Sequence, residues 1–139
     1  MKEILAFVRM NKTNVTKRSL LNAGAAGFIA MKVEGRGKLV TDRESLAGLK
    51  NDLMAKGQFD DTDNIQDVET LVEGFLDDSR LFARRMFQIV CEDDEVGKIV
   101  KAIIDVNKTS YKMGDGKIFV LPLENAVRVR TGETGSAAL

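Results

Sequence analysis

The run GDGKIFVLP at Gly114–Pro122 is the feature that most constrains the fold of this chain. Two glycines separated by one residue precede a run of β-branched and aromatic residues, which is typical of a tight loop that enters a strand. Pro122 has no backbone N–H and therefore predicts the end of that strand. Lys117 adds a cation at the junction, beside backbone that can approach an anion closely. The run predicts an anion-binding loop followed by a strand.

Apolar runs elsewhere in the chain predict a mixed α and β domain. β-rich runs predict strands at Glu3–Arg9, Phe28–Val33, Phe82–Cys91 and Lys117–Leu121, with a short fifth strand at Ala126–Arg130. Two helices are expected between these strands, giving the order βαββαβ. That order predicts an α+β, ferredoxin-like domain.

The two helices are indicated by different signals. The first is expected at Thr13–Ala23, with Gly24 as its stop. The second is indicated by apolar residues at helical spacing, namely Val96, Ile99, Val100, Ile103 and Ile104. The expected N-caps are Thr13 or Asn14 for the first helix and Asp93 or Asp94 for the second.

Composition indicates one globular domain and excludes several classes of protein. The chain has 139 residues, 44% of them hydrophobic, and carries 21 basic and 21 acidic residues. The absence of a basic excess argues against a nonspecific nucleic-acid binder. No run approaches the roughly 18 apolar residues of a membrane helix, and no secretory signal is present, so a cytoplasmic location is expected. The chain lacks histidine, and its single cysteine, Cys91, is expected to be a buried structural thiol.

The charges are unevenly distributed along the chain. Between Val40 and Arg80 there are eleven acidic and four basic residues, so this segment has a net charge of −7 and the remainder +7. The segment also contains two short amphipathic patterns, each consistent with a helix. Its apolar positions that could contact a partner are Leu49, Leu53, Val68, Leu71 and Phe75. These stripes could be covered by each other, by the body of the protein or by a partner.

Two further groups could bind phosphate. The run GRGK at Gly35–Lys38 ends the second expected strand with two glycines and a cation. Arg128 and Arg130 are two residues apart, so in a strand they would project from the same face. Arginine suits the bidentate binding of phosphate oxygens. The alternative interpretation is that these are ordinary surface charges.

These motifs together resemble those of the PII signal-transduction family, the GlnB/GlnK-like nitrogen regulators. Residues Met1–Gly37 are similar to the first strand, helix and second strand of that family, Leu81–Asp94 to the strand that leaves its T-loop, and Gly114–Pro122 with Ala126–Glu133 to its C-terminal signature. The resemblance implies a single domain over residues 1–139 and a PII-type trimer. The T-loop would be extended, at about residues 39–80.

The resemblance also implies a nucleotide site between neighbouring subunits that takes ATP or ADP, with Mg²⁺ accompanying ATP. The implied nucleotide-binding residues are Ile29, Gly35, Gly37, Lys38, Val90, Gly114, Asp115, Gly116, Lys117, Arg128 and Arg130. Val90 and the Gly114–Lys117 loop would come from one subunit, together with the GRGK run. Arg128 and Arg130 would come from its neighbour. No metal site built from the protein's own side chains is expected, and Asp115 is expected to shape the loop.

A second ligand, 2-oxoglutarate, is implied beside the phosphates. Its implied residues are Gly37, Lys38, Leu39 and Arg84. Leu39 stands where the family has a glutamine, and a leucine cannot bind Mg²⁺ or donate a hydrogen bond. Arg84 replaces a lysine and can still pair with a carboxylate. The geometry for 2-oxoglutarate therefore departs from the family pattern.

The long acidic segment is most similar to that of the nitrogenase-associated PII-like proteins, which occur as a pair, and specifically to the second, longer-armed member. This implies a regulator, without a catalytic residue, that inhibits dinitrogenase reversibly through its T-loop. It would act as a homotrimer or as a hetero-oligomer with its paired paralogue. The alternatives are a GlnK-like regulator of an ammonium transporter or glutamine synthetase, a nucleotide-hydrolysing enzyme, and a structural trimer without ligand.

Overall fold

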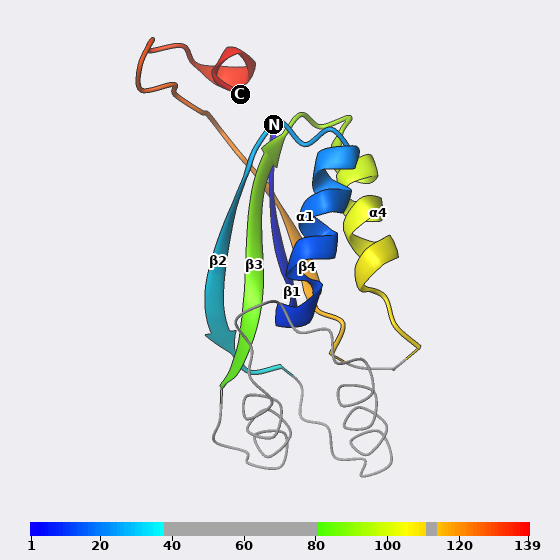
Figure 1. Ribbon diagram of the computed structural model, residues 1–139. Coiled ribbons are helices and arrows are strands. Elements are labelled where there is room, and N and C mark those ends of the chain that lie inside the picture. The colour runs from blue at the N-terminus through cyan, green and yellow to red at the C-terminus, as the bar shows by residue number, and fades with distance from the viewer. Residues whose placement is uncertain (38–80, 111–113) are drawn as a thin grey trace.

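A computed structural model of the protein describes residues 1–37, 81–110 and 114–139 (Figure 1). Its strands are β1 (Lys2–Arg9), β2 (Phe28–Gly35), β3 (Phe82–Cys91) and β4 (Lys117–Pro122), and its helices are α1 (Thr13–Asn22) and α4 (Val96–Asn107). Short 3₁₀ helices, η1 and η2, lie at Met10–Lys12 and Gly135–Ala138. The order βαββαβ confirms the predicted α+β, ferredoxin-like fold. The long acidic segment, called here the arm (about residues 39–80), lies outside the described residues. This applies to its candidate partner-binding positions, Leu49, Leu53, Val68, Leu71 and Phe75, and also to Lys38 and Leu39.

The four strands form one antiparallel sheet in the order β2-β3-β1-β4. Central β1 pairs with β3 on one side and β4 on the other, so that Ile4 lies opposite both Ile89 and Val120. Helices α1 and α4 lie side by side on one face of this sheet (Figure 1). All loops between strand and helix therefore lie at one end or the other of the sheet.

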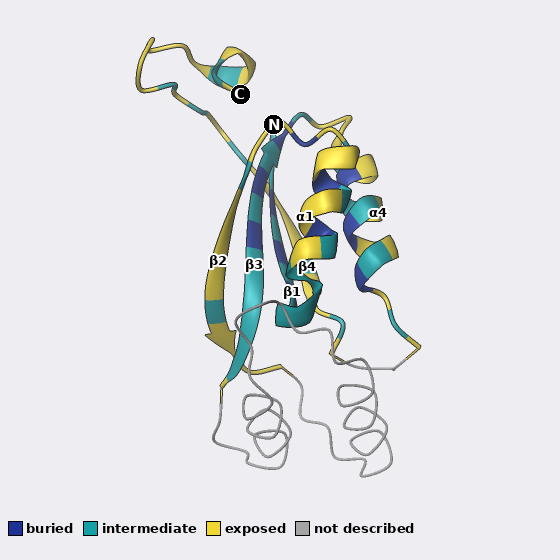
Figure 2. Cartoon of the chain, in the orientation of Figure 1, coloured by how far each residue is buried: buried dark blue, intermediate teal, exposed yellow. Residues whose placement is uncertain are grey.

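The core lies between the helices and the sheet, as the buried positions in Figure 2 show. Alternate residues of β1 and β3 face the helices, as the period of a strand requires. The buried core residues are Ile4, Ala6, Val8, Leu20, Ala25, Phe87, Ile89, Cys91, Ile99 and Ile103. The predicted apolar stripe of α4 is confirmed by buried Ile99 and Ile103. The last residue of that stripe, Ile104, is 46% exposed.

Buried hydrogen bonds fix α1 against α4. The Asn107 side-chain amide donates to Thr16 Oγ1 (2.9 Å) and to the Ile103 carbonyl oxygen (2.8 Å). Nearby, the Ser19 hydroxyl donates to the Ala102 carbonyl oxygen over 2.9 Å. Such bonds are strong in a low-dielectric interior and allow one register of the two helices.

The end of α1 is predicted correctly. Gly24 has φ +78°, and the N–H groups of Gly24 and Ala25 donate to the carbonyls of Leu21 and Leu20 over 3.0 and 3.1 Å. This pair of bonds is the Schellman arrangement, which favours glycine because a left-handed residue is required.

The predicted N-caps are wrong. The Thr13 hydroxyl donates to the Met10 carbonyl (2.6 Å), because η1 leads directly into α1 and already supplies its first turn. Asp93 does not cap α4: its carboxylate pairs with the α-amino group of Met1 at 2.8 Å, and the N-cap position is Glu95.

The expected fifth strand at Ala126–Arg130 is also wrong. The segment forms only an isolated bridge between Val127 and Thr134. Gly132 and Gly135 have φ +73° and +64°, so the chain turns back on itself here and does not continue along the sheet. Arg128 and Arg130 therefore do not lie on the face of a regular strand.

No described element covers the second face of the sheet, called here the open sheet face. Its apolar residues are Leu5, Phe7, Ile29, Met31, Val33, Phe82, Met86, Val90, Phe119 and Leu121. Ile29 and Phe119 are 57% and 48% exposed, and the Phe7 and Phe119 rings meet edge to face at 5.9 Å. An apolar sheet face of this size is unusual on a monomer and indicates an interaction surface.

Cys91 is 3% exposed, which confirms the predicted buried thiol. Burial, followed by the negative charge of Glu95, raises the pKa of this thiol. We expect a disulfide reagent to label native Cys91 more slowly than Cys91 of the unfolded chain, by about three orders of magnitude or more, because labelling needs an opened state.

The raised pKa of Cys91 in the folded protein also affects the stability of the fold. The free energy of unfolding falls as the pH rises through the unfolded cysteine pKa of about 8.5, because the unfolded chain then loses its thiol proton more readily than the folded chain. Cys91→Val should remove that fall in urea unfolding between pH 8 and 9.5, and an unchanged fall would contradict this account.

Candidate functional site: a glycine loop and two arginine-bearing ends of one sheet

The loop before β4 contains two glycines that the protein itself requires. Gly116 has φ +114°, and a Cβ there would lie 1.9 Å from the Phe7 carbonyl oxygen. Gly114 has φ +88°, and its Cβ would lie 3.1 Å from Arg9 Nη2. From the sequence alone, both glycines are explained by the approach of an anion. The structure shows that they also let the loop pack onto the end of β1.

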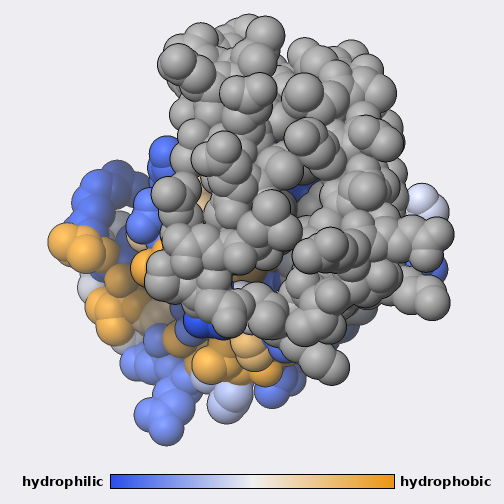
Figure 3. All heavy atoms as spheres, turned by 90° about the horizontal axis from the view of Figure 1, so that it is seen from below, coloured by the Kyte–Doolittle hydropathy of each residue, from blue (hydrophilic) through white to orange (hydrophobic). Residues whose placement is uncertain are grey.

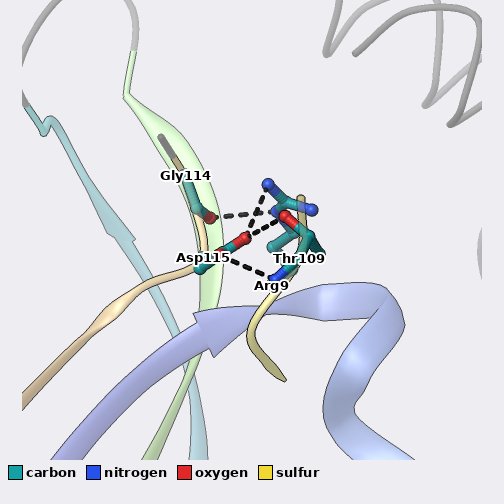
Figure 4. Close-up of polar contacts among 4 residues, drawn as sticks. All are labelled: Arg9, Thr109, Gly114 and Asp115. Atoms are coloured by element: carbon teal, nitrogen blue, oxygen red, sulfur yellow. Dashed lines mark hydrogen bonds and ion pairs between the residues drawn. The ribbon is translucent and has the colours of Figure 1, made fainter. Parts of the chain in front are cut away.

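Asp115 lies between these glycines, and its carboxylate contacts Thr109 and Arg9 (Figure 4). Its Oδ2 accepts the Thr109 backbone N–H at 2.9 Å, and its Oδ1 accepts the Thr109 hydroxyl at 2.6 Å. Arg9 Nη2 pairs with the same Oδ1 at 3.2 Å, and Arg9 Nε donates to the Gly114 carbonyl at 2.9 Å. These contacts agree with the expectation that Asp115 shapes the loop.

Other candidate residues lie at the same end of the sheet. The pairing places Lys117 opposite Phe7, Arg84 opposite Arg9, and Gly35 opposite Phe82. Gly37 lies two residues after the end of β2. Figure 3 views the molecule from this end, and the coloured residues visible there include hydrophobic residues next to hydrophilic ones. One end of the sheet thus brings together Gly35, Gly37, Arg84 and the Gly114–Lys117 loop.

Among these residues, Arg84 is the cation whose pKa is shifted by its surroundings. Burial, and then the positive charge of Arg9, lowers the pKa of Arg84 from its ordinary value. Its guanidinium lies 5.9 Å from the centre of the Phe82 ring, and Nη1 donates to the Ala83 carbonyl at 3.2 Å. A guanidinium remains charged in proteins, so a bound anion would relieve this unfavourable environment.

The remaining candidates lie at the opposite end. Ile29 pairs with Gln88 and Val90 with Glu3, close to the end of β3 and the start of β1. The segment that follows β4, which contains Arg128 and Arg130, runs beyond this end of the sheet (Figure 1). Val90 pairs with Glu3 and Lys117 pairs with Phe7, so Val90 and the Gly114–Lys117 loop of one subunit lie toward different ends of β1.

Arg128 already has an anionic partner and a backbone hydrogen-bond acceptor in its own chain. Its Nη1 pairs with Glu133 Oε2 at 2.6 Å, and its Nη2 donates to the Leu139 backbone oxygen at 3.1 Å. The Thr131 hydroxyl donates to the same Glu133 oxygen at 2.7 Å. The tail that follows β4 is therefore folded around Arg128.

Sequence reasoning missed Arg9 and Thr109. No local motif marks either residue, and they meet Asp115 only because β1 ends beside the loop. It also missed the 2.6 Å hydrogen bond from the Gln88 amide to Glu3 Oε1, a polar contact on the open sheet face. Only the strand register brings these two residues together.

Two further findings bear on function. Within residues 1–37, 81–110 and 114–139, no three acidic, cysteine or histidine side chains gather as a metal site. In the same ranges, no helix combines the length and apolar character needed to cross a bilayer.

The fold and this loop define a small α+β domain of the ferredoxin-like type with a glycine-rich loop before its last strand. The family model of nitrogen regulatory protein P-II matches residues 1–133, and the chain belongs to this family. It is 38% identical, over its full length and 99% of the relative, to the nitrogen fixation nifHD region GlnB-like protein 2 of Methanobacterium ivanovii. A protein of that type from Methanosarcina barkeri and the nitrogen regulatory protein P-II of Microchaete diplosiphon are each 34% identical over all of this chain.

Proposed function

We propose that the protein is a PII-type nitrogen-regulatory signalling protein that binds ATP or ADP between its subunits. One observation carries this proposal: the cationic candidates of one chain are divided between opposite ends of its sheet. Strand β4 alone separates Lys117 from Pro122 by about 17 Å, at a rise of about 3.3 Å per residue. Lys117 and the arginines beyond Pro122 can therefore meet around one nucleotide when they come from two chains.

The open sheet face offers the surface for that assembly. The exposed apolar residues of this face include Ile29, Met31 and Phe119. The face extends between the two ends of the sheet that carry the cationic candidates. A contact in which one end of a subunit meets the other end of its neighbour is heterologous, and such contacts form a ring when the rotation between neighbours closes. A trimer fits this scheme, either of identical chains or with a paired PII-like paralogue.

The residues fit a polyphosphate ligand. Gly114 and Gly116 have positive φ, so this loop can present backbone to an anion, with the exposed Lys117 beside it. Mg²⁺ would be held by phosphate oxygens and water, as Mg²⁺ commonly is. Arg84, buried beside a second arginine, could take a carboxylate such as that of 2-oxoglutarate. The nucleotide contacts of Ile29 and Val90 remain part of the same proposal.

We propose that the protein inhibits dinitrogenase reversibly through the arm at residues 39–80. The relatives named for the nifHD nitrogen-fixation region support this assignment. Nucleotide and metabolite would favour one arm conformation through their different affinities for the two states. In this scheme the protein is a regulator and no step of catalysis is assigned to its side chains.

The test is calorimetric titration with MgATP, with and without 2-oxoglutarate. We expect ATP to bind, and Lys117→Ala to weaken binding by about tenfold to a hundredfold, because one charge-assisted contact to phosphate is lost. Lys101→Ala is the matched control, since Lys101 pairs with Asp105 on the exposed surface of α4. Absence of ATP binding to the wild-type protein, or equal affinities of wild type and Lys117→Ala, would contradict the proposed site.

A further inference from the structure

We propose that Arg9, Thr109 and Asp115 form a latch that positions the Gly114–Lys117 loop, and that Asp115 is a positioning residue and not a ligand of the nucleotide. The effect of the latch on nucleotide affinity rests on the function proposed above. The effect on the loop itself does not.

The hydrogen-bonding capacity of Asp115 is directed inward. Both carboxylate oxygens are engaged, Oδ1 by the Thr109 hydroxyl and by Arg9, and Oδ2 by the Thr109 N–H. The Asp115 side chain is 28% exposed and that of Arg9 is 11% exposed. A carboxylate turned toward its own chain, as in Figure 4, contributes three contacts to the loop and keeps its charge away from an incoming phosphate.

These contacts join the Gly114–Lys117 loop to two other parts of the chain. The two hydrogen bonds between Thr109 and Asp115 link it to the residues that follow α4. Arg9 links it to the end of β1 through Asp115 and the Gly114 carbonyl. The fit of Gly116 against the Phe7 carbonyl oxygen adds a further contact with β1. With Gly114–Lys117 held in this way, less conformational freedom is lost when a ligand binds, which improves affinity.

The latch also determines which cations remain for an anion. Arg9 lies opposite Arg84 in the β1–β3 pairing, and the two positive charges repel each other. Asp115 compensates the charge of Arg9 and holds its guanidinium on the loop side. Arg84 and Lys117 are two described cations that could serve a ligand at this end of the sheet.

The experiment combines two measurements on the full chain. Amide hydrogen exchange of peptides covering residues 108–117, without nucleotide, reports on the loop, and calorimetry with MgATP reports on affinity. The variants are Asp115→Asn, which removes the charge, Thr109→Val, which removes the hydroxyl at constant shape, and Thr109→Ser, which restores it. Asp105→Asn is the matched control, because it removes the same charge from the exposed Lys101–Asp105 pair. Circular dichroism and thermal melting establish that each variant is folded.

We expect loop exchange in Asp115→Asn to be faster by about tenfold and ATP affinity to be lower by about tenfold, the cost of one charge-assisted hydrogen bond. Thr109→Val should show the same two changes at about threefold. Thr109→Ser and Asp105→Asn should match the wild type in both measurements. If Asp115→Asn does not fold, Thr109→Val and its serine rescue still decide the matter.

Two outcomes would overturn the latch. One is loop exchange at the wild-type rate in both Asp115→Asn and Thr109→Val. The other is a loss of affinity in Asp115→Asn alone with loop exchange unchanged, which would make Asp115 a direct ligand. If the wild type does not bind ATP but loop exchange responds as expected, the latch is supported and the proposed nucleotide function is wrong.

Discussion

Replacing Gly116 with alanine should abolish nucleotide binding and lower the melting temperature. The new Cβ would lie 1.9 Å from the Phe7 carbonyl oxygen, and φ +114° is strained for any residue with a side chain. Because the obstacle is backbone of the central strand, the loop has to leave its position on β1. Strain of this kind, together with the displaced contacts, costs about 3 kcal/mol or more. We expect no heat of MgATP binding at concentrations that saturate the wild type.

Gly97→Ala provides the matched control for this substitution. Gly97 lies in α4, and a Cβ there would meet nothing within 4 Å. Alanine favours a helix over glycine by about 1 kcal/mol, so this variant should be as stable as the wild type or slightly more stable. Urea unfolding and calorimetry on both variants would separate the two sites. A Gly116→Ala protein with wild-type stability and wild-type affinity would show that the loop can occupy another position.

Replacing Phe119 with aspartate should dissociate the assembly into single chains. Phe119 is 48% exposed and contacts Phe7 on the open sheet face, which we expect to be buried between subunits. An unpaired carboxylate in an apolar interface costs several kcal/mol, so association should weaken by on the order of a thousandfold. Sedimentation equilibrium measures this directly. Nucleotide binding should fall with it, because each site would lose the half that a neighbour supplies.

Val120→Asp is the matched control on the same strand. Val120 is 46% exposed and lies on the opposite face, toward the helices. It therefore receives the same charge at nearly the same exposure but outside the proposed interface. We expect it to keep the mass of the wild-type assembly. If Phe119→Asp also keeps that mass, the open sheet face is not the assembly surface.

Much of the fold was predictable because its signals are local. The β-rich runs of β1 and β3 and the apolar stripe from Val96 to Ile103 are patterns of neighbouring residues, and the structure confirms the two strands and the helix that they predict. Gly24 was identified as a helix stop because a left-handed residue at that point has few substitutes.

The errors arise where distant residues decide the outcome. The cap expected at Asp93 competes with the amino group of Met1, and the strand expected at Ala126–Arg130 is replaced by a turn that Gly132 and Gly135 permit. The same holds for the site. Glycines and a lysine before β4 mark the loop, but nothing near Arg9 or Thr109 in the sequence indicates that they meet Asp115.

The tail after β4 has a consequence for how Arg128 can meet any anion. Glu133 and the Leu139 backbone oxygen occupy its guanidinium, so an incoming oxygen exchanges with these partners and does not neutralise a bare charge. The free energy gained is then the difference between two ion pairs, and one carboxylate returns to water for each anion taken up. The protein carries its own competitor at this arginine, and the strength of that competitor limits how tightly Arg128 can hold anything else.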